Sequence, residues 1–265
     1  MNRSQIAAQL YTCRDLLKTP SGIAKTLRRL RDVGYTAVEV AGLGPISDQE
    51  LAKILDAEGL TVCSAHADGD KLLSDPAAVV QKLKILNCGL TAYPYPAGFD
   101  LTDSSSVGEL IKKLDAAGAH LAAEGVTLTY HNHAMEFLKT DGVTVLDRIY
   151  GETDRANLQA ELDTYWIHYG GGENAAWCRK LDGRLPIMHL KDYGFTAANK
   201  PTYCELGAGT LDFSAIVAAA EAAGCRWFVV EQDETPGDPV ESLRQSFDHL
   251  TSTICGSSDS ELGFS

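Results

Sequence analysis

The sequence predicts an α/β protein built as a single (β/α)8 barrel, and three observations lead to this prediction. Short β-rich runs alternate with longer amphipathic segments, which implies parallel strands joined by right-handed crossovers. Eight strand–helix units in about 250 residues fit a closed barrel better than an open sheet. A doubly wound sheet would usually show a glycine-rich turn after its first strand, and Tyr11–Asp15 has no glycine. The predicted strands begin near Ile6, Tyr35, Leu60, Cys88, Val126, Leu158, Leu185 and Arg226.

The segments between the predicted strands carry helix signals. Ile23, Leu27 and Leu30 repeat at the spacing of one helix face, which predicts an apolar stripe packed on the sheet. Ser47–Glu50 and Ser106–Glu109 have the spacing of capping boxes, in which a hydroxyl and a carboxylate satisfy free amides at a helix start. We therefore expect helices to begin at both places.

The last helix and the end of the chain are predicted from similar signals. Asp238 precedes Pro239, which predicts an N-cap followed by a proline in the first turn. Glycines 34, 59, 125 and 224 are expected just past helix ends, in a left-handed conformation. The barrel is predicted over residues 1–255, and the small, polar residues 256–265 are predicted to form a disordered tail.

Composition favours a globular protein that acts on a small molecule. Hydrophobic residues make up 45% of the 265 residues and charged residues 22%, which excludes wholesale disorder. The net charge of −13 argues against nucleic acid and anionic membrane surfaces as partners. Charged residues interrupt every apolar stretch before the roughly 20 residues of a spanning helix. Seven cysteines without a Cys-x-x-Cys pair predict reduced thiols in a cytoplasmic protein, and a homo-oligomer stays open.

Polar side chains stand at the ends of the last four predicted strands. Catalytic groups of (β/α)8 barrels lie at the C-terminal ends of the strands, where this chain has Glu136, Asp163, His189 and Glu231. Ionised carboxylates that converge on one mouth repel each other unless a counter-charge is present. Three carboxylates and one imidazole suit Mn²⁺, Mg²⁺, Co²⁺ or Zn²⁺. One divalent metal ion is therefore predicted, and a metal-free polar network is the alternative.

Six segments in order along nearly the whole chain carry a family resemblance. The sequence resembles the sugar phosphate isomerase/epimerase proteins of the xylose-isomerase-like TIM barrel superfamily. The resemblance implies a divalent metal on the four strand-end residues above, with Glu136 and Glu231 also moving the proton. The six segments are Gln9–Asp15, Gly34–Glu39, Tyr130–Phe137, Glu161–Trp166, His189–Asp192 and Val230–Pro239.

These residues predict proton transfer next to a carbonyl. A metal that chelates a carbonyl and its adjacent hydroxyl acidifies the C–H between them and stabilises the enediolate. Two carboxylates can then remove and return the proton, giving an epimer or an isomer. We expect a sugar or keto-sugar isomerase or epimerase. The alternatives are a lyase or dehydratase acting on a keto-inositol or 3-keto glycoside, a DNA-repair endonuclease, which the charge opposes, and a non-catalytic sugar-binding barrel.

Two departures from the epimerase relatives concern the substrate. Trp166 stands where they have a histidine and is expected to be a platform for a sugar ring or an aromatic aglycone. The relatives also have an arginine shortly after the metal histidine, and positions 190–206 of this chain contain none. Lys191 is expected to supply that positive charge instead. His133 is predicted to contact a substrate oxygen, or else to orient Glu136. His66 and Tyr93 are predicted either to line the substrate pocket or to pack in the core. Glu39 is predicted either to accept a hydrogen bond from a sugar hydroxyl or to pair with Arg14.

Two further features are interpreted conservatively. Glu161 lies two residues before Asp163 in the same strand, so both side chains face the same side. Glu161 is predicted to be a buried, hydrogen-bonded carboxylate. Gly207–Gly209 lies where barrels often bind phosphate on backbone amides. No lysine or arginine adjoins these glycines, so a phosphorylated substrate is not inferred.

Overall fold

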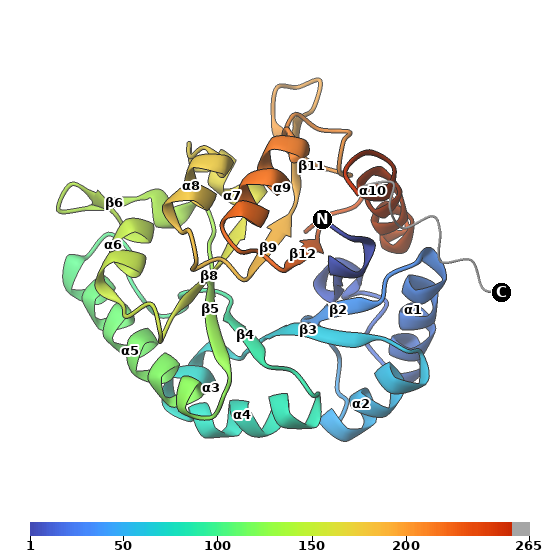
Figure 1. Cartoon of the computed structure of the whole chain (residues 1–265), viewed down its shortest axis with the longest axis horizontal. Helices are drawn as coiled ribbons and strands as arrows, with labels where there is room; N and C mark the ends of the chain where they lie inside the picture. Colours follow the sequence, from blue (N-terminus) through green and yellow to red (C-terminus); the bar gives the residue numbers. More distant parts are fainter. Residues whose placement is uncertain (256–265) are drawn as a thin grey trace.

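The computed structural model describes residues 1–255, and in it eight parallel strands close into a barrel (Figure 1). β1 pairs in parallel with β2 on one side and with β12 on the other, which closes the ring. Every strand begins within two residues of its predicted start, so the predicted barrel is confirmed. The strands are β1 (Ile6–Gln9), β2 (Ala37–Val40), β3 (Thr61–His66), β4 (Leu90–Tyr93), β5 (Thr127–His131), β8 (Gln159–Asp163), β9 (Ile187–Leu190) and β12 (Trp227–Val230).

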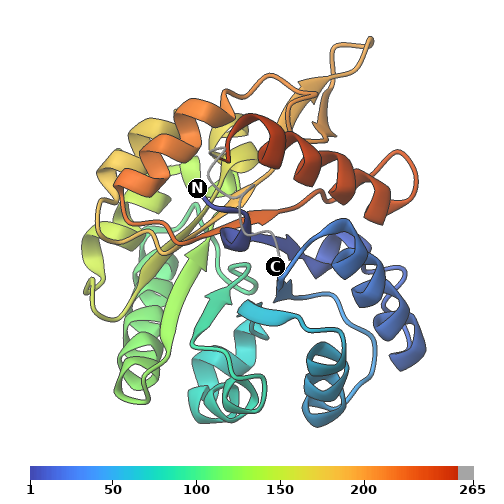
Figure 2. The ribbon, with the colours of Figure 1, turned by 45° about the vertical axis from the view of Figure 1, so that its right-hand side comes forward.

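Helices form the outer layer around the strands (Figures 1 and 2). The predicted stripe of Ile23, Leu27 and Leu30 is fully buried, as expected for a helix that packs on the sheet. The helices are α1 (Pro20–Val33), α2 (Asp48–Ala57), α3 (Gly69–Ser74), α4 (Pro76–Ile85), α5 (Ser104–Ala123), α6 (Val145–Glu152), α7 (Thr164–Tyr169), α8 (Asn174–Lys180), α9 (Phe213–Ala222) and α10 (Pro239–Thr253).

Two small hairpins lie in the loops that follow β5 and β9. The first pairs β6 (Lys139–Thr140) with β7 (Val143–Thr144), and the second pairs β10 (Asp192–Phe195) with β11 (Pro201–Cys204). The second hairpin projects from the top of the barrel in Figure 2. Both loops therefore extend the end of the barrel at which the strands terminate.

Most of the predicted helix caps are confirmed. Ser47 accepts a hydrogen bond from the Glu50 amide at 3.2 Å, and Asp238 accepts one from the Val240 amide at 3.0 Å. Glycines 34, 59, 125 and 224 all have positive φ angles, as predicted for residues that end a helix. The predicted tail at 256–265 lies outside the described residues.

The predicted helix start at Ser106 is wrong. α5 begins two residues earlier, because Asp103 is the N-cap and its carboxylate accepts the Ser105 amide at 3.0 Å. The Ser106 hydroxyl instead accepts the amide of Asp100 at 2.9 Å and ties the preceding turn to the helix. An aspartate three residues upstream takes the N-cap position, so the capping-box spacing at 106–109 does not mark the boundary.

Two glycines in α5 give a matched test of packing against the barrel. A Cβ at Gly118 would lie 2.0 Å from the backbone oxygen of Asn157, whereas a Cβ at Gly108 would have no atom nearer than 3.9 Å. We expect Gly118→Ala to lower the free energy of unfolding by about 1–3 kcal/mol through overpacking. Gly108→Ala is expected to raise it by up to about 1 kcal/mol through helix propensity. Urea unfolding of both variants checks this, and equal effects would contradict it.

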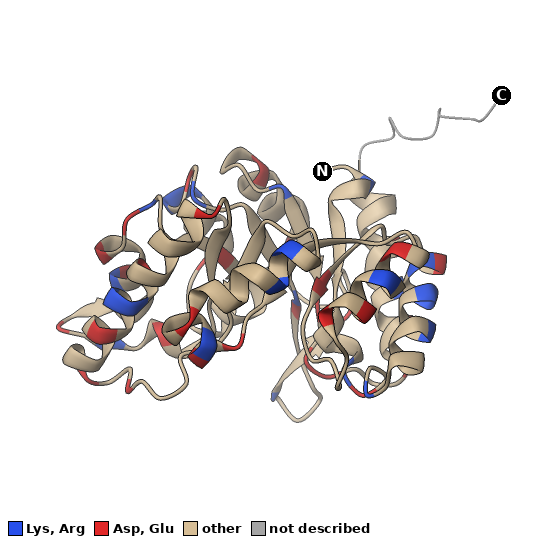
Figure 3. Ribbon diagram, turned by 90° about the horizontal axis from the view of Figure 1, so that it is seen from below, with Lys and Arg blue, Asp and Glu red and all other residues tan. Residues whose placement is uncertain are grey.

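Charge and cysteine placement agree with a globular protein. Figure 3 shows acidic residues beside the basic ones on the outer helices. Cys13, Cys63, Cys88, Cys178 and Cys225 are buried free thiols, as the sequence predicts. Among residues 1–255, no helix has the length and apolar character needed to cross a membrane.

Candidate metal centre

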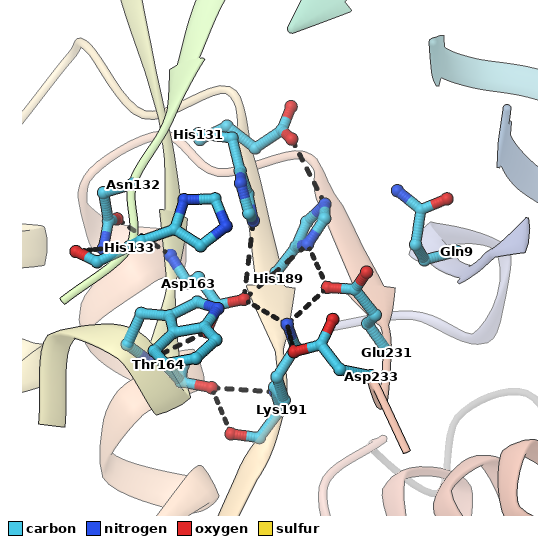
Figure 4. Close-up of polar contacts among 12 residues, drawn as sticks. Gln9, His131, Asn132, His133, Asp163, Thr164, His189, Lys191, Glu231 and Asp233 are labelled. Carbon is cyan, nitrogen blue, oxygen red and sulfur yellow. Dashed lines mark hydrogen bonds and ion pairs between the residues drawn. The ribbon is translucent and has the colours of Figure 1, made fainter. Parts of the chain in front are cut away.

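Four potential ligands meet at the C-terminal ends of neighbouring strands (Figure 4). They are His131 at the end of β5, Asp163 at the end of β8, His189 in β9 and Glu231 directly after β12. One ligand atom from each lies within 4.8 Å of the others, and all four residues are buried. His189 Nδ1 lies 2.9 Å from Glu231 Oε2 and 3.9 Å from Asp163 Oδ2. His131 Nε2 lies 3.5 Å from the same Asp163 oxygen.

The buried ring nitrogens of His131 have no hydrogen-bond partner within the part of the chain that the structure describes. The Oδ2 atom of Asp163 is different, because Lys191 Nζ lies 3.0 Å from it and forms an ion pair. A buried polar atom without a partner costs about 1–3 kcal/mol, so such atoms are rarely left unpaired without a reason. Two imidazole nitrogens and two carboxylate oxygens form a ligand set that suits Zn²⁺, Mn²⁺ or Co²⁺. The residues therefore fit the predicted divalent ion.

The local backbone fixes the orientation of Asp163. Its Oδ1 atom accepts the Trp166 amide at 3.0 Å and thereby caps the first turn of α7. The amide oxygen of Asn132 accepts the Asp163 N–H at 3.1 Å. These bonds hold one carboxylate oxygen in the helix cap and leave the other directed at the ligand group.

Lys191 lies beside the ligand group with its ammonium fully buried. Its Nζ atom is 2.8 Å from Glu231 Oε2, 3.0 Å from Asp163 Oδ2 and 3.0 Å from Asp233 Oδ2. Burial lowers the pKa of Lys191, but the three carboxylates outweigh that effect and hold the pKa well above its ordinary value. Lys191 therefore supplies a permanent positive charge, although it contacts ligand residues rather than standing free for a substrate.

The structure does not bring Glu136 into this group. It lies in the short turn η3 (Met135–Phe137), which folds back on β5. Its Oε1 atom accepts from the Tyr130 hydroxyl at 2.9 Å and its Oε2 atom accepts from the His133 amide at 2.8 Å. Burial raises the pKa of Glu136. His131, at the end of β5, takes the place beside Asp163, His189 and Glu231 that the sequence predicts for Glu136.

A second group of potential ligands lies on the other side of His189. It comprises Glu39 from β2, His66 from β3, Glu161 from β8 and His189 itself, again with one atom of each within 4.8 Å of the others. His189 Nε2 is 2.6 Å from Glu39 Oε2 and 3.2 Å from Glu161 Oε1. His66 Nε2 is 3.0 Å from Glu161 Oε1 and 3.6 Å from Glu39 Oε1. The two groups therefore share one imidazole ring.

Two of the predicted substrate contacts, Glu39 and Tyr93, are buried and already have partners within the protein. Glu39 is fully buried and accepts from the Gln9 amide at 2.7 Å, whereas Arg14 bonds the Tyr11 carbonyl oxygen. Tyr93 is 1% exposed and stacks on Tyr130, so it is a packing residue in this structure.

His133 and Trp166 face each other beside the ligand group, with ring centres 5.4 Å apart. His133 Nδ1 and Trp166 Nε1 are buried atoms without a hydrogen-bond partner among residues 1–255. Burial, with the charges of His131 and Lys191, lowers the pKa of His133 to about 3, so its ring stays neutral. These two atoms therefore have unused hydrogen-bonding capacity beside the ligand group.

A carboxylate occupies the Gly207–Gly209 loop, for which the sequence analysis infers no phosphate. The amides of Gly207 and Gly209 donate to Asp192 Oδ2 at 3.0 Å and 2.9 Å, and the Leu211 amide donates to Asp192 Oδ1 at 3.2 Å. Asp192 therefore satisfies the amides that a phosphate group would need.

Sequence reasoning missed two residues of the centre, His131 and Asp233. His131 ends its strand in a His-x-His pattern, and Asp233 follows Glu231 by two residues. A stricter rule that ligands stand within one residue of the strand end would have favoured His131 over Glu136. No sequence signal set Asp233 apart from its acidic neighbours.

Comparisons with known proteins agree with this fold. A family model described as xylose isomerase-like TIM barrel matches residues 27–253. Inosose dehydratase from Geobacillus thermodenitrificans (strain NG80-2) is 28% identical over 164 residues, which cover 56% of this chain and 54% of that protein. This chain thus matches about half the length of that relative.

Two solved structures are similar over nearly their whole length. A sugar phosphate isomerase/epimerase from Parabacteroides distasonis ATCC 8503 has a TM-score of 0.79 and 21% identity, covering 94% of this chain and 98% of that one. A xylose isomerase-like TIM barrel protein from Mycobacterium smegmatis, solved in complex with magnesium, has a TM-score of 0.70 and 17% identity, covering 95% and 99%. At these identities the two likenesses show the fold.

Proposed function

Because the chain belongs to the xylose isomerase-like TIM barrel family, we propose that it is a divalent-metal-dependent enzyme acting on a keto-sugar or keto-polyol. Its reaction begins with removal of a proton from the carbon next to the carbonyl. The observation that carries this proposal is the buried group of His131, Asp163, His189 and Glu231, in which the ring nitrogens of His131 lack hydrogen-bond partners in the described chain.

A divalent ion bound by these four residues would polarise the substrate carbonyl and stabilise the negative charge that develops as the neighbouring C–H loses its proton. Glu231 is the proposed base. It is held beside His189 and Lys191, whose charge and hydrogen bonding outweigh the effect of burial and keep the pKa of Glu231 well below its usual range. Its carboxylate is therefore ionised and ready to accept a proton at neutral pH.

The groups that can move a proton decide where the proton goes next. Glu231 is the proposed base, and the Lys191 ammonium, buried 2.8 Å from Glu231 Oε2, is not free to act on a substrate as an acid. Epimerisation needs a second group on the opposite face, and both oxygens of Glu136 are bonded to Tyr130 and His133. We therefore propose an isomerase, in which the proton returns to the neighbouring carbon on the same face.

A dehydratase is the second candidate, and one observation favours it. The chain is 28% identical to an inosose dehydratase over the matched segment. In this reaction Glu231 would take the proton from the carbon next to the carbonyl, and the leaving hydroxyl would pick up a proton from solvent, which releases water and leaves a double bond. The two candidates share the first step and differ only in whether a hydroxyl group leaves.

Substrate recognition is proposed to involve Trp166 and His133. Trp166 offers an apolar face and an indole N–H, and His133 Nδ1 adds another polar atom without a partner in residues 1–255. Because Asp192 occupies the amides of Gly207 and Gly209, we propose an unphosphorylated substrate.

Proton NMR in D₂O with a panel of ketoses, 3-keto glycosides and keto-inositols tests the proposal on the Mn²⁺-loaded protein. We expect deuterium at the carbon next to the carbonyl, and loss of this exchange after chelation. A retained hydroxyl identifies an isomerase, and an unsaturated product identifies a dehydratase. Exchange that survives complete metal removal, or no exchange with any compound of the panel, would overturn the proposal.

A further inference from the structure

We propose that the barrel holds a second divalent cation, bound by Glu39, His66 and Glu161 and sharing His189 with the first. This site goes beyond the proposed function, which needs only one ion. The four residues come from β2, β3, β8 and β9, so the site lies across the barrel interior, on the other side of the shared ring.

The second group contains a buried atom that points to a missing ligand. Glu39 is 0% exposed, and its Oε1 atom has no hydrogen-bond partner among the residues that the structure describes. His66 Nε2 lies 3.6 Å from this oxygen, too far for a hydrogen bond. A cation between these atoms would satisfy the carboxylate oxygen, which burial otherwise leaves unpaired.

Charge gives an independent argument. Glu39 and Glu161 are both fully buried, and their other hydrogen-bond partners include the neutral side chains of Gln9 and Thr129. Lys191 forms its ion pairs with Asp163, Glu231 and Asp233, on the far side of His189. The positive charge that balances these two carboxylates therefore comes either from protonated His66 and His189 rings beside them or from a bound cation.

The donor atoms indicate the class of ion. Two imidazoles and two carboxylates suit Zn²⁺, Mn²⁺ or Co²⁺ better than Ca²⁺ or Mg²⁺, which prefer oxygen ligands alone. The side chain of His66 is 14% exposed, so the group can be reached from solvent.

His189 can serve both ions because its nitrogens face opposite groups. Nδ1 lies 2.9 Å from Glu231 Oε2, and Nε2 lies 2.6 Å from Glu39 Oε2. When both sites are filled, the ring coordinates one ion through each nitrogen and its remaining N–H proton leaves to solvent. The two ions are then joined through a single imidazolate.

Metal counting on the full chain tests this inference with Co²⁺ as the probe. After equilibrium dialysis, we expect two Co²⁺ per wild-type chain and one per chain in His66→Asn and in Glu161→Gln. Asp163→Asn is the matched control for the first site, and this variant should also retain one Co²⁺ per chain. Two ions bridged by His189 should couple magnetically, which would weaken the EPR signal per ion between one and two equivalents.

One Co²⁺ per wild-type chain, unchanged in His66→Asn and Glu161→Gln, would overturn the second site and leave the proposed function intact. That result would mean that a protonated His66 supplies the positive charge instead. No Co²⁺ in the wild-type chain would overturn both. Thermal unfolding in chelator shows that each variant is folded, and the wild-type stoichiometry keeps the test decisive if one variant fails to fold.

Discussion

Replacing Glu231 by glutamine is expected to slow exchange of the substrate proton about 100- to 10,000-fold, the usual contribution of a positioned general base. Glutamine retains an oxygen ligand but cannot accept the proton, so the variant should still bind metal, with weaker affinity. The exchange rate in D₂O at saturating Mn²⁺ measures the effect.

A nearby glutamate provides the matched control. Glu234 is exposed and lies three residues further along the same loop, so Glu234→Gln removes a carboxylate without touching the centre. Its exchange rate should equal that of the wild type. If Glu231→Gln exchanged the proton as fast as Glu234→Gln with metal bound, Glu231 would not be the base.

Replacing Lys191 by methionine is expected to lower the free energy of unfolding of the metal-free protein by about 3–5 kcal/mol. The reason is that Asp163 and Glu231 would stay buried and charged without the ammonium that contacts them. A bound cation would restore the balance, so Mn²⁺ should stabilise the variant more than it stabilises the wild type. Urea unfolding with chelator and with Mn²⁺ measures both effects.

Lys180→Met is the control for this experiment. Lys180 pairs with Asp147 on the surface, where removal of an ion pair costs about 1 kcal/mol or less. Similar losses for Lys191→Met and Lys180→Met in chelator would contradict the view that Lys191 neutralises the buried carboxylates. If Mn²⁺ raised the free energy of unfolding equally in the wild type and in Lys191→Met, a bound metal ion would not replace the charge of Lys191.

The barrel could be predicted from sequence because its signals are local and repeat eight times. Each strand is a short apolar run, each helix has its own stripe and cap, and parallel connections follow from the alternation. The family resemblance is confirmed by the match to residues 27–253. The helix start at Ser106 was wrong because Asp103 competed for the same role, and spacing alone does not rank two acceptors.

The candidate centre was only partly predictable. Asp163 and His189 lie in their strands and Glu231 directly after one, so strand position alone brings them together. Glu136 lies five residues beyond β5, and the direction of that turn depends on its bonds to Tyr130 and the His133 amide. Loop direction of this kind is set by tertiary contacts, which residue spacing does not reveal.

The second group could not be assembled from sequence for a different reason. Glu39 and Glu161 are 122 positions apart in the chain, and they meet because barrel closure sets β2 opposite β8 and β9. From sequence, each carboxylate has a separate interpretation: Glu39 as a hydroxyl acceptor or a partner of Arg14, and Glu161 as a buried hydrogen-bonded group. Their meeting depends on the shape of the closed ring.

Anomalous diffraction from crystals grown with Mn²⁺ tests the centre most directly. We predict a peak at bonding distance from His131, Asp163, His189 and Glu231. A peak bonded to Glu136 while His131 points away, or no peak between these side chains at full Mn²⁺ occupancy in solution, would contradict the account.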